Sequence, residues 1–586
     1  MELKKSRILA LLLSAFAFAI TVQTPVHAAL NSVDYAMYFH SEVKDSEECR
    51  MSVENGEIVT PGVLRNLSMT CPDMFSWQLF TEVVRDQFWT NWADETQNWP
   101  AVPYPLCADP EKPGENCCTP NHPDKNPAGH CPVFPLDLAR AQTSAKLLKA
   151  EPEARIGRPS IMAHHNPAMP FDATLLEERL IKKIRQPKLK EGETPACAAV
   201  GVTPADIITQ KTISESESIG RIVRQTNAEI TVRNRSFHYY LFRNNLYNAD
   251  GVAEAFLRHS QNLQKNAPYR SLNGYTSKDA TSALSKIDLP ADAIMIKSNW
   301  LHEGLAKQLG IQDTPETGFI KKHLITPISY GDNKTCNLEG THYLMAFHIS
   351  SKDIPKWVWT TFEHIQMPGR CDITGCNDSY GYRNPNPNLP KNVADNYIAP
   401  KTKSDNLNSP SVVFDRDSIY PPEPIRAGLE SVLDDLSIGI KPSVNPKEPT
   451  PQDLAWRNYR LKGSQVDFVD STGRSNLLGN SITEAGFMDG SSCITCHARA
   501  GIKVTPMPKD KTLACSESQS VLNGKYCYTF FGLGVFENNL SEFGYARSAH
   551  GIPNPDWYYA NATPPALNIL PVDFIWGFLF ASPLVK

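Results

Sequence analysis

The sequence predicts an α+β fold, with a large, loop-rich and disulfide-containing region at 29–466 and a smaller, mainly α region at 467–586. Three observations support this fold class. The 46 prolines among 586 residues favour turns and short elements over long helices. Helical periodicity and strand-like alternation both recur along the chain. The 14 cysteines of this loop-rich chain indicate a framework of disulfides.

Residues 1–28 have the pattern of a secretory signal peptide. A basic stretch at 4–7 precedes an apolar run at 8–20, and the sequence VHA at 26–28 resembles a cleavage site. The apolar run is too short to span a bilayer, and no later run is longer. We therefore expect export by a cleaved signal peptide, no membrane span and, in a bacterium, a location in the periplasm.

An amphipathic helix is predicted from Ser76 to about Trp92. Its aromatic and aliphatic residues recur at three- and four-residue steps and predict a buried face, which consists of Trp77, Phe80, Val84, Phe88 and Trp92. Two further segments, 134–150 and 172–185, also have a helical pattern.

The middle of the chain favours strands. Residues 228–248 alternate and are rich in aromatic and β-branched side chains, and 293–300 forms a second strand-like run. The segments 340–350 and 356–364 have the pattern of paired strands. Helices are expected at 252–265 and 424–440, and the turn-rich stretch 372–406 predicts a long loop.

Most cysteines are expected to form disulfides. Setting two of them apart for the motif described next leaves an even number. Cys371 and Cys376 are close enough to close a tight loop, Cys515 and Cys527 bracket a short segment, and Cys49 and Cys71 flank another. The remaining cluster consists of Cys107, Cys117, Cys118 and Cys131. A zinc site that combines these four with His122 and His130 is the alternative.

The sequence Cys493-Ile494-Thr495-Cys496-His497 forms a C-x-x-C-H motif, the spacing at which c-type haem is attached. Positions i, i+3 and i+4 share one face of a helical turn, so two thiols and an imidazole can meet one ligand. The motif predicts one covalent haem c on Cys493 and Cys496, with His497 as the iron ligand, on a helix at 493–502. A redox disulfide or half of a zinc site is the alternative.

The second axial ligand determines what such a haem can do. A Met or His ligand suits electron transfer, and an open position permits oxygen or peroxide chemistry. The candidates are His364, Met507 and His550, or no ligand at all. An aromatic tail, with Trp557, Phe574 and Trp576 among its residues, is expected either to line the cofactor pocket or to form the last packing layer.

The motif in its setting, GSSCITCHARAG, resembles the cytochrome c family. The segments SWQLF near Ser76, WVWTTFEH at 357–364 and DFIWGFLF at 573–580 resemble large exported proteobacterial proteins with a single haem and an uncharacterised function. This resemblance implies a cytochrome c-like haem region at 467–586. The chain lacks the second C-x-x-C-H of di-haem peroxidases and a clear downstream Met ligand, so enzymatic activity stays open.

Three functions follow from these residues. The first is a periplasmic c-type cytochrome that passes electrons to or from a redox partner protein or a small-molecule donor or acceptor. The second is a haem-dependent oxidoreductase with an open distal site, in which Glu363 and His364 act as acid and base and Arg370 stabilises negative charge. The third is a thiol-disulfide protein that uses Cys493 and Cys496. The net charge of −5 and the lack of a basic run argue against nucleic-acid binding.

Overall fold

A computed structural model describes most of the chain between residues 45 and 585. The described residues are 45–46, 48–137, 155–156, 194–214, 219–265, 286–330, 334–367, 376–381, 397–398, 425–439, 455–469, 476–485, 491–531, 552–553, 558–560, 562 and 566–585. The predicted signal peptide, the helix at 172–185 and most of the helix at 134–150 lie outside them.

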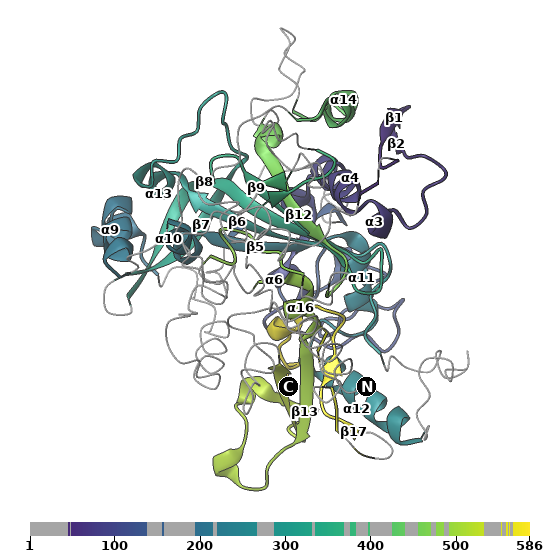
Figure 1. Cartoon of the computed structure of the whole chain (residues 1–586). Helices are drawn as coiled ribbons and strands as arrows, with labels where there is room; N and C mark the ends of the chain where they lie inside the picture. The colour runs from purple at the N-terminus through teal and green to yellow at the C-terminus, as the bar shows by residue number, and fades with distance from the viewer. Residues whose placement is uncertain are drawn as a thin grey trace, which may run out of the picture.

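The molecule is built around a largely antiparallel eight-stranded sheet with the order β12-β9-β8-β6-β5-β3, in which β7 pairs with β8 and β4 with β7. Its strands are β3 (Ala93–Asp94), β4 (Arg155–Ile156), β5 (Ala228–Arg233), β6 (Ile294–His302), β7 (Lys321–Tyr330), β8 (Lys334–Ser351), β9 (Val358–His364) and β12 (Tyr459–Gln465). The predicted strand at 293–300 and the predicted strand pair at 340–350 and 356–364 are confirmed as β6, β8 and β9. Figure 1 shows helix α4 (Pro72–Arg85) and helix α16 (Cys493–Ala498) on opposite sides of this sheet.

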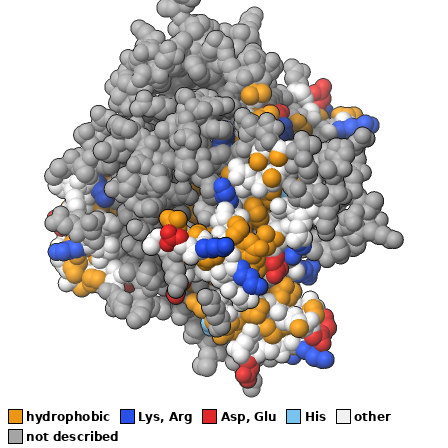
Figure 2. Space-filling model, turned by 90° about the horizontal axis from the view of Figure 1, so that it is seen from below, with side chains coloured by type: hydrophobic (Ala, Val, Ile, Leu, Met, Phe, Trp, Pro, Cys, Tyr) orange, Lys and Arg blue, Asp and Glu red, His pale blue; other side chains and the backbone are white. Residues whose placement is uncertain are grey.

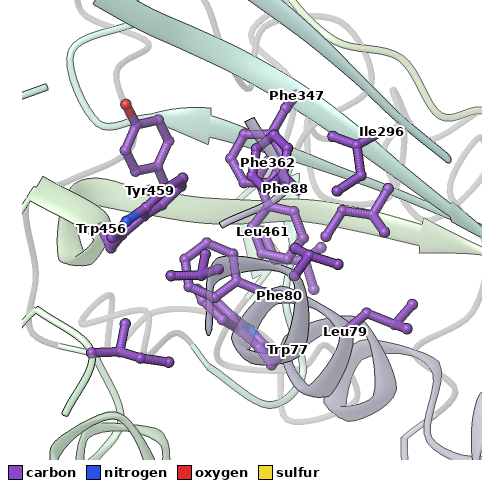
Figure 3. Packing of buried hydrophobic residues seen from close by; sticks show 14 of the residues in the cluster. Trp77, Leu79, Phe80, Phe88, Ile296, Phe347, Phe362, Trp456, Tyr459 and Leu461 are labelled. Atoms are coloured by element: carbon purple, nitrogen blue, oxygen red, sulfur yellow. The ribbon is translucent and has the colours of Figure 1, made fainter. Parts of the chain in front are cut away.

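One face of the sheet packs against α4 through aromatic side chains. Phe80 lies 5.0 Å from Phe362 and 6.1 Å from Phe347, measured between ring centroids, and Trp77 packs edge-on against Phe362 at 5.1 Å (Figure 3). Fully burying such side chains stabilises a fold by about 1.5–3 kcal/mol each. The predicted aromatic face is therefore core, as its spacing indicated.

The predicted helix over 76–92 is present but interrupted. Helix α4 ends at Arg85, and a separate turn, α5 (Phe88–Asn91), follows. Gln87 between them has a φ of 51°, in the left-handed region, which breaks the α-helical path. The break lets Phe88 and Trp92 stay buried although the chain changes direction.

The prediction of strand over 228–248 is correct only for its first part. Strand β5 ends at Arg233, and helix α11 (Arg235–Arg243) follows it. Asn234 caps this helix because its side-chain oxygen accepts a hydrogen bond from the N–H of Phe237 at 3.2 Å. Phe237, Leu241 and Phe242 are buried at helical spacing, so aromatic residues that favour strands are here used in a helix.

The predicted mainly α region at 467–586 is wrong, and with it the predicted fold class. Among the described residues of this region, α16 ends at Ala498 and strand β13 begins at Gly501, where a helix was expected to continue. The region forms a four-stranded antiparallel sheet in the order β14-β15-β13-β18, where β13 is Gly501–Pro506, β14 Ser520–Val521, β15 Tyr526–Phe531 and β18 Leu570–Pro571. The β-branched residues of GIKVTP favour this strand.

Disulfides are confirmed. They join Cys49 to Cys71, Cys107 to Cys117, Cys118 to Cys131, Cys197 to Cys336 and Cys515 to Cys527. The four clustered cysteines are thus taken by disulfides, and the alternative zinc site with His122 and His130 is wrong. Cys371 lies outside the described residues.

The remaining helices and short strands lie outside these two sheets. The predicted helices at 252–265 and 424–440 are confirmed as α12 (Ala249–Lys265) and α14 (Ala427–Asp435). The others are β1 (Ser52–Glu54), β2 (Glu57–Val59), α3 (Leu67–Thr70), α6 (Glu95–Asn98), α9 (Pro204–Ser214), α10 (Ile219–Thr226), α13 (Glu303–Gln308), β10 (Cys376–Asn377), β11 (Tyr397–Ile398), β16 (Tyr559–Ala560) and β17 (Ala566–Leu567).

Two further features concern the surface and the helices of the described residues. Figure 2, seen from below, shows hydrophobic side chains interspersed with Lys, Arg, Asp and Glu, so neither charge dominates the described part of that face. None of the helices within the described ranges has both the length and the apolar character needed to cross a bilayer.

Candidate dithiol site

The face of the main sheet opposite α4 is polar although it is buried. Directly opposed residues of antiparallel strands share one face. One row across the sheet places Thr231, Lys297, His348 and Thr361 in register. The next row on this face contains Glu229, Asn299, Ala346 and Glu363. We call these two rows the polar face. Buried polar groups require partners, so the segment that covers the face must supply them.

The loop at 476–485 covers the polar face and supplies hydrogen-bond partners to Glu363 and Asn299. Ser481 donates to the Glu363 carboxylate from its backbone N–H at 2.9 Å and from its hydroxyl at 2.6 Å. The hydroxyl of Thr483 donates to the side-chain oxygen of Asn299 at 2.6 Å. Glu484 places a carboxylate oxygen 3.5 Å from Nε2 of His348. The loop therefore lies directly between the sheet and α16.

Helix α16 carries the two thiols and is fixed at its first turn. Ser492 caps the helix through its hydroxyl, which accepts from the N–H of Thr495 at 3.4 Å. Gln465 at the end of β12 accepts from the N–H of Ile494 at 3.0 Å and donates to the Ser492 hydroxyl at 2.9 Å. The Cys493 thiol donates weakly to the carbonyl of Leu478, with sulfur and oxygen 3.6 Å apart.

The predicted motif residues share one face of α16. Cys493, Cys496 and His497 are half-buried, whereas Ile494, Thr495 and Ala498 are buried. Cys493 and Cys496 are thiols and not half-disulfides. The structure therefore brings the three sequence-predicted residues together, as the i, i+3, i+4 spacing predicted.

His497 is held by the C-terminal segment. Its Nδ1 hydrogen-bonds to the backbone carbonyl of Phe574 at 2.8 Å. Its ring lies 4.4 Å from the Trp359 ring and 6.1 Å from the Trp576 ring, measured between centroids. Burial lowers the pKa of His497 to about 3, so the imidazole is neutral at physiological pH. The aromatic tail thus contributes to the packing of this region.

The charged groups of the polar face affect the ionisation of the Cys493 thiol. Burial raises the pKa of the Cys493 thiol well above its usual range, and the Glu484 carboxylate adds to this rise. Burial alone would raise the pKa of Glu484, but His348, Lys297 and the N–H of Asn480 outweigh it and lower the pKa. Glu484 is therefore ionised near neutral pH while Cys493 is protonated.

The ammonium group of Lys297 also acts on the Glu484 carboxylate. The ammonium group of Lys297 is 3.1 Å from a carboxylate oxygen of Glu229. Burial opposes the charged form of Lys297, yet Glu229 and Glu484 outweigh it and raise its pKa. Positively and negatively charged side chains of the polar face therefore lie next to each other beneath α16.

The prediction of one covalent haem c is corrected by the side chains of this site. No group of three or more His, Cys, Asp or Glu side chains that could hold a metal ion occurs in the part of the chain that the structure describes. The ring of His497 instead packs against Trp359 and bonds to Phe574, and ten of the described cysteines outside the motif pair in five disulfides. The motif therefore presents two thiols without an iron ligand set around them.

Of the three candidate distal ligands, the two that the structure describes are engaged elsewhere. His364 is buried away from α16, where Nε2 bonds to the carbonyl of Gly318 at 3.0 Å and Nδ1 accepts from the N–H of Gln366 at 3.1 Å. Met507 packs against the Cys515–Cys527 disulfide, with its sulfur 3.6 Å from that of Cys527. His550, like Arg370, lies outside the described residues.

Sequence reasoning did not identify the residues beneath the dithiol. Gln465 and Glu484 lie in segments without a motif, and His348 has the pattern of an ordinary strand residue. The sequence indicates these residues only by one polar side chain in each of three strands that pair in the sheet. These side chains are Lys297, His348 and Thr361. That signal becomes readable only when the strand register is known.

Comparison with known proteins identifies no relative: no protein-family model, curated protein or solved structure matches this chain. The resemblance to cytochrome c proteins stays a prediction. The fold and the site define a disulfide-containing protein built on a largely antiparallel sheet, with a Cys-x-x-Cys dithiol placed against a buried polar face.

Proposed function

We propose that this protein transfers electrons by thiol-disulfide exchange at Cys493 and Cys496. One observation carries the proposal: the five described disulfides account for the other described cysteine side chains, while these two thiols share one turn of α16. A Cys-x-x-Cys pair on a helical turn is the arrangement of dithiol redox motifs.

The reaction moves two electrons and two protons. One thiolate attacks a disulfide of the oxidant and forms a mixed disulfide, and the second thiol displaces the oxidant's other sulfur as a thiolate. Cys496 is assigned the first attack because the pKa of Cys493 is raised by burial. The partner is a protein disulfide or a small-molecule disulfide. This is the third function expected from the sequence, a thiol-disulfide protein that uses Cys493 and Cys496.

The compartment of this reaction is part of the proposal. The described disulfides are consistent with an oxidising, extracytoplasmic environment. The segment predicted to be a cleaved signal peptide, 1–28, favours the periplasm of a bacterium. In an oxidising compartment the two thiols stay reduced only if a reductant regenerates them or if they oxidise slowly.

A redox titration of the native full-length protein tests the proposal. We expect Cys493 and Cys496 to lose reactivity toward an alkylating reagent together as the thiol-to-disulfide ratio of the buffer is lowered, with loss of two hydrogens from the peptide mass. Re-reduction should restore both thiols while the Cys197–Cys336 disulfide stays oxidised, because that pair is buried.

Single variants provide the control. Cys493→Ser should form a stable mixed disulfide at Cys496 that does not resolve, whereas Cys496→Ser, which keeps only Cys493, should react slowly. Two results would overturn the proposal: a pair that stays reduced at every potential, or a peptide mass increase that persists after reduction, which would show a thioether-linked group on the two cysteines.

A further inference from the structure

We infer that Glu484 and His348 form the proton relay that allows Cys493 to close the disulfide. This inference rests on the proposed thiol-disulfide function and assigns a role to the polar face beneath α16. It starts from a chemical requirement: the resolving thiol must lose its proton before it can attack, because the thiolate is the nucleophile.

Close packing places Glu484 beside the start of α16. A Cβ added at Gly479 would lie 2.9 Å from Cβ of Ser491 and 3.5 Å from Cβ of Glu484, so only glycine fits between them. The neighbouring Leu478 accepts from the Cys493 thiol and donates its N–H to the Ser491 carbonyl at 3.1 Å. The same loop thus contacts the thiol and positions the carboxylate.

A hydrogen bond fixes the Glu484 carboxylate, and an imidazole that can take up its proton lies beside it. The backbone N–H of Asn480 donates to Oε2 of Glu484 at 2.6 Å. The same oxygen is 3.5 Å from Nε2 of His348 on β8. A carboxylate beside an imidazole stabilises the imidazolium that forms when the proton arrives. The His348–Glu484 pair can therefore hold the proton that Cys493 releases.

The charges that face Glu484 come from every element around it. His348 on β8 and Lys297 on β6 act on Glu484 directly, and Glu484 in turn raises the pKa of Cys493 on α16. Farther out, Glu229 on β5 pairs with Lys297 at 3.1 Å, and Glu363 on β9 lies 3.9 Å from Lys462 on β12. His348, Lys297 and the N–H of Asn480 keep Glu484 ionised, so it can accept a proton near neutral pH. Lys462 is engaged with the Gly479 carbonyl at 2.6 Å and fixes the loop.

The proposed step is balanced. The Cys493 S–H bond breaks and its proton passes to Glu484 and on to His348. The Cys493 sulfur forms a bond to the Cys496 sulfur, and the bond between Cys496 and the partner sulfur breaks. The partner leaves as a thiolate with the electron pair of that bond.

The chromogenic disulfide of thionitrobenzoate tests this step in the full-length protein. Attack by Cys496 releases one coloured thiolate, and ring closure by Cys493 releases a second, so the second phase reports the relay. We expect Glu484→Gln to slow the second phase about 100-fold at pH 7, the lower end of general-base effects, with the first phase unchanged. The deficit should shrink as pH rises, because hydroxide then removes the proton.

Matched variants separate a relay from a folding defect. Glu484→Asp keeps a carboxylate and should recover part of the rate, and His348→Gln should slow the second phase. Asp378→Asn removes a buried carboxylate on the α4 side of the sheet and should leave it unchanged. Thermal unfolding of each variant should confirm that it is folded.

Three results would overturn the inference. The first is an unchanged second phase in Glu484→Gln at every pH. The second is an equal loss in Asp378→Asn, which would indicate a general effect of buried carboxylates. The third is the lack of a second phase in the unsubstituted protein, which would contradict the proposed function itself and is thereby distinguished from the other two.

Discussion

At the scale of single residues, Gly381 shows how tightly the α4 side of the sheet is packed. Gly381 is buried against the Trp77 ring, and a Cβ at this position would overlap that ring and lie 2.7 Å from Cδ2 of Leu429. Its N–H donates to Asp378 at 2.8 Å, and the indole N–H of Trp77 donates to the same carboxylate at 3.0 Å. Steric contact and hydrogen bonding therefore fix this position together.

We expect Gly381→Ala to lower the free energy of unfolding by about 1–3 kcal/mol, because overpacking forces side chains or backbone to shift. Urea unfolding followed by tryptophan fluorescence measures this change. Gly428→Ala is the matched control: it lies exposed in α14 with nothing within 4 Å of an added Cβ. There the helix propensity of alanine should raise stability by up to about 1 kcal/mol. An equal response at both sites would contradict the packing argument.

At the scale of elements, Asn234 joins helix α11 to strand β6. Its side-chain oxygen accepts from the N–H of Phe237 at 3.2 Å and from the N–H of Ile294 at 3.1 Å. Its amide group donates to the carbonyl of Asp292 at 2.7 Å. One side chain therefore sets both the start of the helix and its position against the sheet.

We expect Asn234→Ala to cost at least about 1 kcal/mol, since loss of a helix N-cap alone costs 0.5–2 kcal/mol. Asn234→Asp keeps the accepting oxygen and should retain more of the stability than Ala does. Chemical denaturation of the two variants gives both values. If the alanine variant is as stable as the unsubstituted protein, the cap does not determine this element.

The same segment shows where sequence patterns are sufficient and where they are not. The alternation over 340–364 predicted two paired strands correctly, because β-branched and aromatic residues suit a half-buried pleated surface. The residues after Asn234 have the same composition but a helical burial pattern, and the cap residue is the signal that separates the two. The expected helix over 493–502 failed because Gly501 begins a strand whose partners, β15 and β18, follow later in the chain.

The site divides in the same way. The spacing of Cys493, Cys496 and His497 placed them on one helical face, because that spacing is local. Binding of a haem iron also requires other ligands and a pocket, and the spacing of these three residues does not specify them. Glu484 and His348 meet only through the register of β6, β8 and β9 and the covering loop, so one sequence could not have paired them.

At the scale of the whole molecule, three carboxylates join distant segments at the start of α4. Asp45 accepts from the N–H groups of Asp73 and Met74, each at 3.0 Å. Asp73 accepts from the N–H of Ser379 at 2.8 Å, and Asp378 accepts from Trp77. Burial and the charge of Asp73 raise the pKa of Asp45 to about 8 and that of Asp378 to about 7.

These raised pKa values make stability depend on pH in a defined direction. In the unfolded chain Asp378 ionises near its ordinary pKa of 3.8, whereas the folded protein keeps its proton up to about pH 7. Its contribution is therefore fully present below pH 3.8 and is lost as pH rises toward 7, by about 1.4 kcal/mol per pH unit. Asp378→Asn is neutral at every pH and should lack this loss.

Urea unfolding at several pH values between 4.5 and 8.5 tests this pH dependence, because the difference between the two proteins cancels the titrating groups that do not interact with Asp378. We expect the free energy of unfolding of the unsubstituted protein to fall relative to that of Asp378→Asn up to about pH 7 and to run parallel to it above. Asp124→Asn, at an exposed position, should show a constant difference. A constant difference for Asp378→Asn as well would mean that the carboxyl is ionised in the folded protein throughout, and that the hydrogen bonds from Trp77 and Gly381 outweigh its burial.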